Sequence, residues 1–562
     1  MRIRSPRPIR HLMFMAIASL VLVCPVSSQQ LSLVRSELFA GSGLCAVCHM
    51  NLYDEEGHDV SIDTHWRSTM MANSARDTYF LAKVSSELTR FPALKDVIHD
   101  KCSVCHMPMG HTQAQADGSI SHMFGENFFS LDEEYNEISL DGVSCTVCHQ
   151  IQRDNLGQPA SFSGGYAIDL TTQTPDRLTY GPFLNPFPNN MRSISGFTPA
   201  YSDHISSSAL CATCHTLYTP YLDETGAVLG EFPEQTPFLE WQHSGYSDGK
   251  PNEKQCISCH MPHAQGAVKI SLIPPNLDPL QPFSQHHFVG GNQFMLSILE
   301  EYATTFELTA SQNQISETME RTENQLKENT ASLTVETVSL LQDLLTISLR
   351  VRTKTGHKFP TGFPSRRAWI HLTVLDSNQS IVFESGAPQT DGTIQGNDAD
   401  MDAEMYEPHY DEITQSNQVQ IYESIMGNHK NEVTYTLLFG AGYLKDNRLL
   451  PNGFEKSTAS NDITTYGMAA HDDNFNNGLD LITYKINAEG FSAPLTVTAE
   501  LLYQSVSYPF IRDIQNDSTE PINHMVEYYS LADQSPMIIS QKQIDTISPT
   551  TSVSPWIQHT QD

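Results

Sequence analysis

The stretch Cys45-Ala46-Val47-Cys48-His49 opens a series of five Cys-x-x-Cys-His pentapeptides in the first half of this chain. The other four occupy residues 102–106, 145–149, 211–215 and 256–260, and the five are called motifs 1 to 5 in chain order. Two thiols at this spacing add to the vinyl groups of a porphyrin, and the histidine that follows them reaches the iron. The motifs therefore predict five covalently bound haems of the c type. The predicted attachment residues are Cys45, Cys48, Cys102, Cys105, Cys145, Cys148, Cys211, Cys214, Cys256 and Cys259, and the predicted proximal iron ligands are His49, His106, His149, His215 and His260.

Two other uses of paired cysteines fit the pattern less well. A structural zinc site of this type needs two cysteine pairs per metal, so five pairs leave one pair over. A redox Cys-x-x-Cys motif occurs singly near a βαβ pattern, which the sequence does not show. Neither use requires a histidine directly after the second cysteine in all five motifs. Haem attachment is the interpretation that accounts for every position.

The N-terminus has the pattern of a secretory signal peptide over residues 1–28. Four arginines precede an apolar run from Leu12 to Val23, and small residues follow around 26–28. Cys24 raises the alternative of a lipoprotein, but Val23 stands where such signals have a small residue. No later stretch has the roughly 20 apolar residues of a membrane span. Removal of the signal leaves ten cysteines, all within the motifs, so we expect an exported protein. The sequence does not separate periplasmic, cell-surface and extracellular locations.

The chain is strongly acidic, with a formal net charge of −33. Such a field repels nucleic acid and anionic membrane surfaces and attracts cationic partners. We therefore expect no nucleic-acid partner and no transmembrane segment. The expected partners are other redox proteins, cytochromes among them. Solubility of an exported protein explains the charge equally well.

The pattern of apolar residues changes near residue 300. Residues 29–300, which hold the motifs, are rich in Gly, Pro, Ser and Asn and predict short helices joined by long loops. Residues 301–335 predict a connector with an amphipathic helix at about 312–333. From 336 to 562, alternating segments such as Leu345–Val351, Ile370–Val374 and Leu495–Leu501 predict an all-β antiparallel sandwich. The expected fold class is thus a short-helical multihaem domain followed by a β-sandwich-like domain.

A haem that only carries electrons usually has a second axial ligand, so distal ligands are also expected. Outside the motifs, the first part of the chain offers ten histidines. His287 is favoured narrowly over His286 because two glycines follow and allow close backbone approach. His357 lies in a Gly-His-Lys-Phe-Pro-Thr-Gly loop between two predicted strands and is expected to reach back to a haem. The candidate distal ligands are His65, His111, His204, His287 and His357, with Met71 as an alternative.

In these motifs the chain resembles a broad group of multihaem c-type cytochromes, which includes tetrahaem carriers of nitrifying bacteria and haem proteins of metal-reducing bacteria. The resemblance also rests on Cys-His-Met-Pro at 105–108 and 259–262 and on residues 356–369, which look like the start of a β-rich C-terminal module of some relatives. In these relatives Trp-x-x-Ser-x-His-Ala often follows the first motif and supplies a distal histidine. Here the matching stretch has Met71 in that place. Either Met71, His65 or another histidine then binds the iron, and a methionine ligand would raise the haem potential.

Three functions remain open from the sequence. The first is an electron carrier, which all five motifs favour because each ends in histidine rather than in the lysine that marks some catalytic haems. The second is an oxidoreductase that acts on a small nitrogen or sulfur compound at one haem with an open position. The third is a subunit of an extracellular haem filament formed by self-assembly. The acidic residues at 391–404 and 472–473 raise calcium as a further ligand, without the spacing of an EF-hand.

Overall fold

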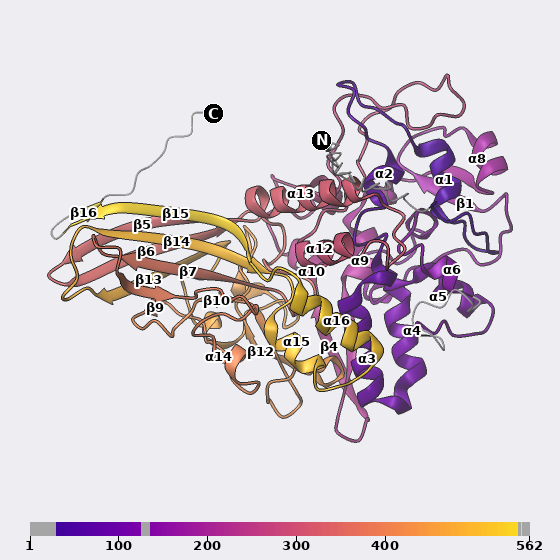
Figure 1. Cartoon of the computed structure of the whole chain (residues 1–562). Helices are drawn as coiled ribbons and strands as arrows, with labels where there is room; N and C mark the ends of the chain where they lie inside the picture. The colour runs from indigo at the N-terminus through magenta and orange to yellow at the C-terminus, as the bar shows by residue number, and fades with distance from the viewer. Residues whose placement is uncertain (1–29, 125–134, 549–551, 554–562) are drawn as a thin grey trace, which may run out of the picture.

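The computed structural model of the chain describes residues 30–124, 135–548 and 552–553. Figure 1 shows short helices and loops gathered in the N-terminal part and an elongated β-rich C-terminal part beside them. Helix α13 (Gln312–Asn329) lies where the two parts meet, at the position predicted for an amphipathic helix. The predicted signal peptide lies outside the described residues. Among the helices of the described ranges, none is long and apolar enough to cross a membrane.

Each motif lies on or at the end of a short helix. In a helix, residues i, i+3 and i+4 share one face, so both cysteines and the following histidine of a motif point to the same side. The five helices are α1 (Ser42–His49), α4 (Lys95–His106), α7 (Cys145–Cys148), α9 (Ser208–His215) and α11 (Cys256–His260). The helical conformation therefore turns a local sequence spacing into a three-point binding face.

Other short elements hold these helices in place. They are α2 (Ile62–Trp66), α3 (Thr78–Arg90), α5 (Pro108–Ala116), α6 (Asn136–Ser139), α8 (Pro188–Ile194), α10 (Pro237–Gln242) and α12 (Gln293–Glu301). Strands β1 (Leu178–Gly181) and β2 (Thr198–Tyr201) form a parallel pair, and β3 (Leu217–Leu222) and β4 (Val228–Gln235) form an antiparallel hairpin.

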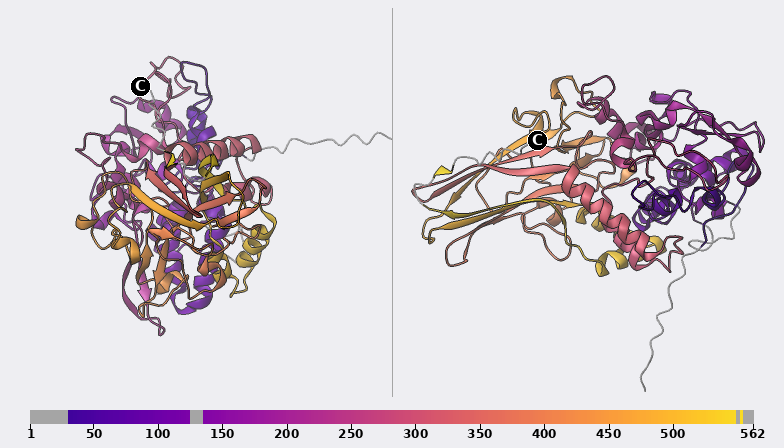
Figure 2. Two further views of the ribbon diagram at one scale, coloured as in Figure 1. Left: turned by 90° about the vertical axis from the view of Figure 1, so that its left-hand side faces the viewer. Right: turned by 90° about the horizontal axis from the view of Figure 1, so that it is seen from above.

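The C-terminal part contains two five-stranded sheets. One has the order β16 (Ser552–Val553), β5 (Ala331–Leu341), β6 (Leu344–Thr353), β13 (Leu479–Asn487) and β9 (Glu412–Ile413). The other has the order β10 (Ile421–Tyr422), β7 (Arg367–Leu375), β14 (Leu495–Gln504) and β15 (Met537–Ile547), with β8 (Ile381–Ser385) paired to β7. Figure 2 shows the sheets as two layers. Alternate residues such as Leu349 of β6 and Leu372 of β7 belong to one shared hydrophobic core. All pairings within the two sheets are antiparallel except β13 with β9.

The C-terminal part is not all-β, which corrects the prediction for residues 336–562. It also contains α14 (Asp398–Met401), α15 (Tyr508–Ile514) and α16 (Glu520–Leu531), besides the short strand pair β11 (Ser424–Gly427) and β12 (Gly442–Asp446). Both α15 and α16 have proline in the first turn, where a missing backbone N–H costs nothing. Near α15, Asp513 and Asp517 form ion pairs with Arg90 of α3 at 3.0 and 2.8 Å. The two parts of the chain are therefore joined by partly buried ion pairs as well as by the connecting helix.

The loop between β6 and β7, residues 354–366, makes a second junction. Glu240 of α10, fully buried, accepts hydrogen bonds from the Lys358 backbone N–H at 3.0 Å and from Thr361 Oγ1 at 2.8 Å. Its other carboxylate oxygen pairs with Arg448 at 3.0 Å. Since Glu240 belongs to the N-terminal part and the loop to the C-terminal part, this network fixes the loop against the motif-bearing helices.

Candidate haem-binding site

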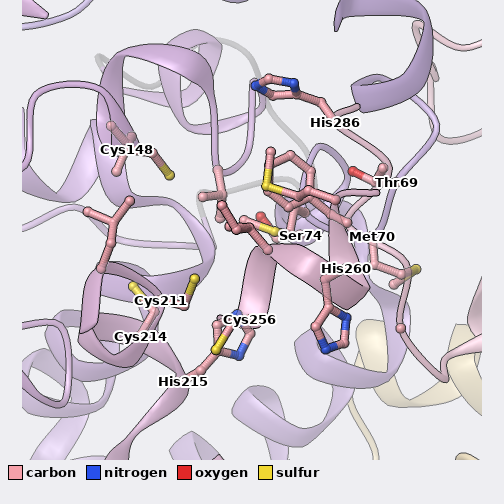
Figure 3. A pocket seen from close by; sticks show the side chains of 18 of the residues that line it. Thr69, Met70, Ser74, Cys148, Cys211, Cys214, His215, Cys256, His260 and His286 are labelled. Carbon is pink, nitrogen blue, oxygen red and sulfur yellow. The ribbon is translucent and has the colours of Figure 1, made fainter. Parts of the chain in front are cut away.

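One cavity of about 1260 Å³ occupies the N-terminal part and reaches the β6–β7 loop. All ten motif cysteines and all five motif histidines line it. Its volume exceeds the roughly 300–1,000 Å³ of pockets that hold a single drug-sized ligand. Figure 3 shows several of these side chains, including Cys211, Cys214, His215 and His260, around the cavity. The fold thus brings five separate sequence motifs to one shared, mostly apolar space.

Three motif histidines are held with Nε2 free. The Nδ1 atoms of His49, His149 and His260 lie 2.7, 2.6 and 2.5 Å from the carbonyl oxygens of Ile270, Tyr180 and Val289. A carbonyl oxygen can only accept, so the proton of each neutral ring is on Nδ1 and the lone pair is on Nε2. This is the arrangement by which second-shell carbonyls orient a metal-binding histidine.

Two further histidine rings face motif histidines across the cavity. The rings of His149 and His286 have centroids 6.5 Å apart, and their planes are inclined by 19°. The centroids of the His260 and His357 rings are 6.2 Å apart, and their planes are inclined by 21°. Metal–nitrogen bonds of about 2 Å place the ring centres of two imidazoles on opposite sides of one metal about 6 Å apart. Each pair therefore has the spacing that one iron between the rings requires.

The distal members of both pairs are also in the form that binds a metal. The Nδ1 atom of His286 lies 3.2 Å from the Ser284 carbonyl oxygen, and that of His357 lies 2.8 Å from the Lys358 carbonyl oxygen. Burial lowers the pKa of His286 to about 3 and lowers that of His357 as well. Both rings are consequently neutral at pH 7, with Nε2 available.

The neighbouring residue, His287, takes a different position. Its ring packs edge-on against His65, with centroids 4.4 Å apart, and neither residue is among the described residues that line the cavity. The geometry thus favours His286 over His287 as the residue opposite His149. His65 is buried on α2, beside the wall of the cavity.

The remaining distal candidates divide in the same way. His204 has its two ring nitrogens within 2.6 Å of Ser202 Oγ and 2.8 Å of the Ile151 carbonyl oxygen, which leaves no nitrogen for a metal. His111 is buried on α5, with its Nδ1 atom 3.0 Å from Ser103 Oγ. It is not among the described residues that line the cavity. Met71 does line the cavity, as does Met70. Among the sequence-predicted distal candidates, His357 and Met71 are therefore the ones that line the cavity.

Thiols of different motifs are near enough to act on one another's pKa. A hydrogen bond with Cys145, together with burial, raises the pKa of the Cys45 thiol. Contacts of the same kind join Cys105 to Cys214 and Cys211 to Cys256. Burial raises the pKa of the Cys148 thiol, and the charge of the nearby Cys214 thiol raises it further. Motif 1 thus neighbours motif 3, and motif 4 neighbours motifs 2, 3 and 5.

The donor set and the cavity fit haem. Each motif supplies two thiols and an imidazole on one helical face, and the wall around them is mainly apolar. Cysteine side chains in the described part are all free rather than joined as disulfides. When bound, haem supplies a one-electron iron couple. The residues present would hold five such groups by the motif cysteines and histidines.

The predicted acidic calcium ligands have other partners. Asp400 forms a buried ion pair with Arg367 at 2.7 Å, and Asp391 accepts hydrogen bonds from the backbone and hydroxyl of Thr393. Asp402 accepts the Glu404 backbone N–H at 2.9 Å. These carboxylates accept hydrogen bonds within turns or pair with Arg367, and they do not converge on one point as calcium ligands would. Calcium binding at 391–404 therefore stays a prediction.

A buried cluster of His409, Asp472 and Asp480 lies in the C-terminal part, with one ligand atom of each within 4.8 Å of the others. Amide nitrogens of Gln420 and Asn447 lie 2.9 and 3.1 Å from His409 Nδ1. Both amides are fixed in orientation, because their oxygens accept backbone N–H groups. His409 Nδ1 is therefore an acceptor, and the ring proton is on Nε2, 3.1 Å from Asp472. A protonated Nε2 donates to the carboxylate and does not bind a metal.

Two buried acids of the site region were missed from the sequence. Glu234 lines the cavity from β4, and Glu240 anchors the β6–β7 loop. The sequence does contain a sign of this burial, because both acids stand among apolar and aromatic residues in Phe232–Trp241. An acid in such a run is either exposed or buried with a specific partner.

Comparison with solved structures gives one similar chain. A crystal structure of a penta-haem cytochrome c552 from Thermochromatium tepidum matches this chain with a TM-score of 0.49. The two share 16% sequence identity over 90% of this chain and 98% of the other. No family model matches the chain, and no curated protein matches it.

Proposed function

We propose that this protein is an exported five-haem c-type cytochrome that transfers electrons between redox partners outside the inner membrane. The observation that carries the proposal is the gathering of all five Cys-x-x-Cys-His motifs around one cavity. Two of their histidines also have a second imidazole at the distance that an iron ligand pair needs. The chain's own contribution is to bind the groups, to orient their axial ligands and to exclude water.

The contacts between thiols give an order for the electron path. Because each thiol is a point of covalent attachment, adjacent thiols make their macrocycles neighbours. The path runs from motif 1 through motif 3 to motif 4, where it divides toward motifs 2 and 5. A branched path suits a carrier that meets more than one partner.

A haem count tests the proposal directly. The full-length protein, expressed in a host that attaches c-type haem, is weighed by intact-mass spectrometry and assayed as the pyridine haemochrome. We expect five haems per chain, and four in a variant with both cysteines of motif 5 replaced by alanine. A wild-type chain that carries no haem, or fewer than five after saturating expression, would contradict it.

One observation favours an oxidoreductase as a second candidate. Within residues 30–124 and 135–548, no ring pair places a second histidine opposite His49, His106 or His215. An iron at one of these positions can keep an open site for a small molecule. Carbon monoxide titration of the reduced protein separates the candidates: a stoichiometric spectral change supports an open haem, and an unchanged spectrum supports a pure carrier.

A further inference from the structure

The carboxylate of Glu234 lies in the cavity wall without a positively charged partner at ion-pair distance in the described part of the chain. Glu234 lies on β4, is 4% exposed and lines the cavity. Its carboxylate accepts a hydrogen bond from Thr219 Oγ1 of β3 at 2.6 Å. Among the described residues, no lysine, arginine or histidine lies at ion-pair distance from it. An unpaired buried carboxylate is unfavourable in its charged form.

The other charges around Glu234 are already compensated. On α3, Lys83 pairs with Asp513 at 2.9 Å, and Glu87 receives the Leu437 backbone N–H at 2.7 Å and lies 3.4 Å from Lys83. On α4, Cys102 and Cys105 become uncharged thioethers once haem is attached. On β12, the Tyr443 hydroxyl donates to the Glu234 backbone carbonyl and not to its carboxylate. Glu231, on the same strand as Glu234, is exposed.

Glu234 is also close to motif 2. Burial, followed by the charges of Glu234 and Glu87, raises the pKa of the Cys102 thiol. Cys102 is an attachment point of the motif 2 haem, so the carboxylate lies near that macrocycle. Any change in the charge of the iron therefore acts on Glu234 through a medium of low dielectric constant.

We propose that Glu234 binds a proton when the haem of motif 2 is reduced and releases it when that haem is oxidised. This inference rests on the proposed function. With haem bound, a one-electron donor such as a reduced cytochrome would supply one electron to the group that motif 2 holds. One proton passes from solvent to the Glu234 carboxylate, where an O–H bond forms. Oxidation by a one-electron acceptor reverses both transfers.

The sign follows from electrostatics. The oxidised iron carries one more positive charge, which favours the ionised carboxylate, and the added electron removes that support. Burial, opposed in part by the Thr219 hydrogen bond, raises the pKa of Glu234 to about 7. Near neutral pH, an electron on the neighbouring haem therefore shifts Glu234 from the ionised to the protonated form. The potential of the motif 2 haem should fall as pH rises, because the ionised carboxylate stabilises the oxidised iron.

Spectroelectrochemical titration of the haem-loaded, full-length protein between about pH 5 and pH 9 tests the proposal. One of the five midpoints should fall with pH, with a slope that approaches about 59 mV per unit for one proton per electron. Glu234→Gln, which imitates the protonated form, should remove the slope and hold that midpoint at its low-pH value. Glu231→Gln, on the exposed side of the same strand, should retain the wild-type slope. A flat wild-type profile, or a slope that survives Glu234→Gln, overturns the proposal.

Infrared difference spectroscopy gives a readout that needs no stable variant. Reduction of the wild-type protein near pH 7 should produce the carbonyl band of a protonated carboxyl group, shifted in D₂O. The absence of such a band, in a protein that carries its five haems, would refute the role of Glu234. A protein without haem would instead refute the proposed function, so the two failures are distinguishable.

Discussion

At the scale of single residues, the two adjacent histidines His286 and His287 have opposite roles in the structure. His286 faces His149 across the cavity, and His287 packs against His65. We predict that His286→Ala converts one haem from low spin to high spin, because an iron loses an axial nitrogen. His287→Ala, its matched neighbour, should leave the number of low-spin haems unchanged. Electron paramagnetic resonance of the oxidised proteins counts the spin states.

The reverse result, a high-spin haem in His287→Ala alone, would assign the ligand to His287. It would also show that a 6.5 Å ring separation is not a guide to ligation in this chain. Both variants remove an imidazole from the same short segment, so a general loss of structure would affect them alike.

The two residues also show what sequence can and cannot predict. Motif cysteines and histidines are a local pattern, and a helix places them on one face wherever the pattern occurs. The rings that face motif histidines come from distant segments: His286 lies 137 residues after His149 (286 − 149), and His357 lies 97 after His260 (357 − 260). Two glycines marked the 286–287 segment, but which of its rings enters the cavity depends on the backbone path there.

At the scale of elements, the β6–β7 loop carries His357 to the cavity and Glu240 holds that loop. We predict that Glu240→Gln lowers the free energy of unfolding by about 1–3 kcal/mol, because Arg448 loses one of its two buried carboxylate partners and keeps Asp446. The same change should weaken ligation by His357 and add high-spin signal. Chemical unfolding and haem absorption measure the two effects together.

The matched control for this variant is Glu323→Gln on α13. Glu323 pairs with Lys327 there, but both side chains are about half exposed, and surface pairs of this kind contribute little. Equal effects of the two substitutions would mean that the buried network does not hold the loop.

The elements of the fold were predictable to different degrees. Period-two alternation marked β6, β7 and β14, and helical spacing marked α13. Helices α15 and α16 were missed, although Ser507 and Thr519 each precede a helix with proline in its first turn. Their apolar faces pack against the N-terminal part, including Tyr79 of α3, and such long-range burial leaves no regular signal in a loop-rich sequence.

At the scale of the whole molecule, motif 4 is the junction of the proposed electron path. Replacement of both Cys211 and Cys214 by alanine should remove one haem and separate motifs 2 and 5 from motifs 1 and 3. After rapid photoreduction, electrons should then redistribute between the two groups much more slowly than in the wild type. Replacement of Cys102 and Cys105 removes an end of the path and should leave redistribution among the other haems fast. Equal kinetics in both variants would argue against a junction at motif 4.

Removal of every haem tests how the cofactors and the fold depend on each other. Without haem, the mostly apolar wall of the 1260 Å³ cavity loses the groups that would cover it, and exposed apolar surface of this kind is unfavourable in water. The N-terminal part of a chain with all ten motif cysteines replaced by alanine should therefore not hold its native packing. The two sheets share a core of their own, with residues such as Leu349 and Leu372, and should persist. Hydrogen exchange should then show unprotected amides in the motif helices α1, α4, α7, α9 and α11 and protected strands from β5 to β15. Protection of the motif helices without haem would mean that the polypeptide alone supports the cavity.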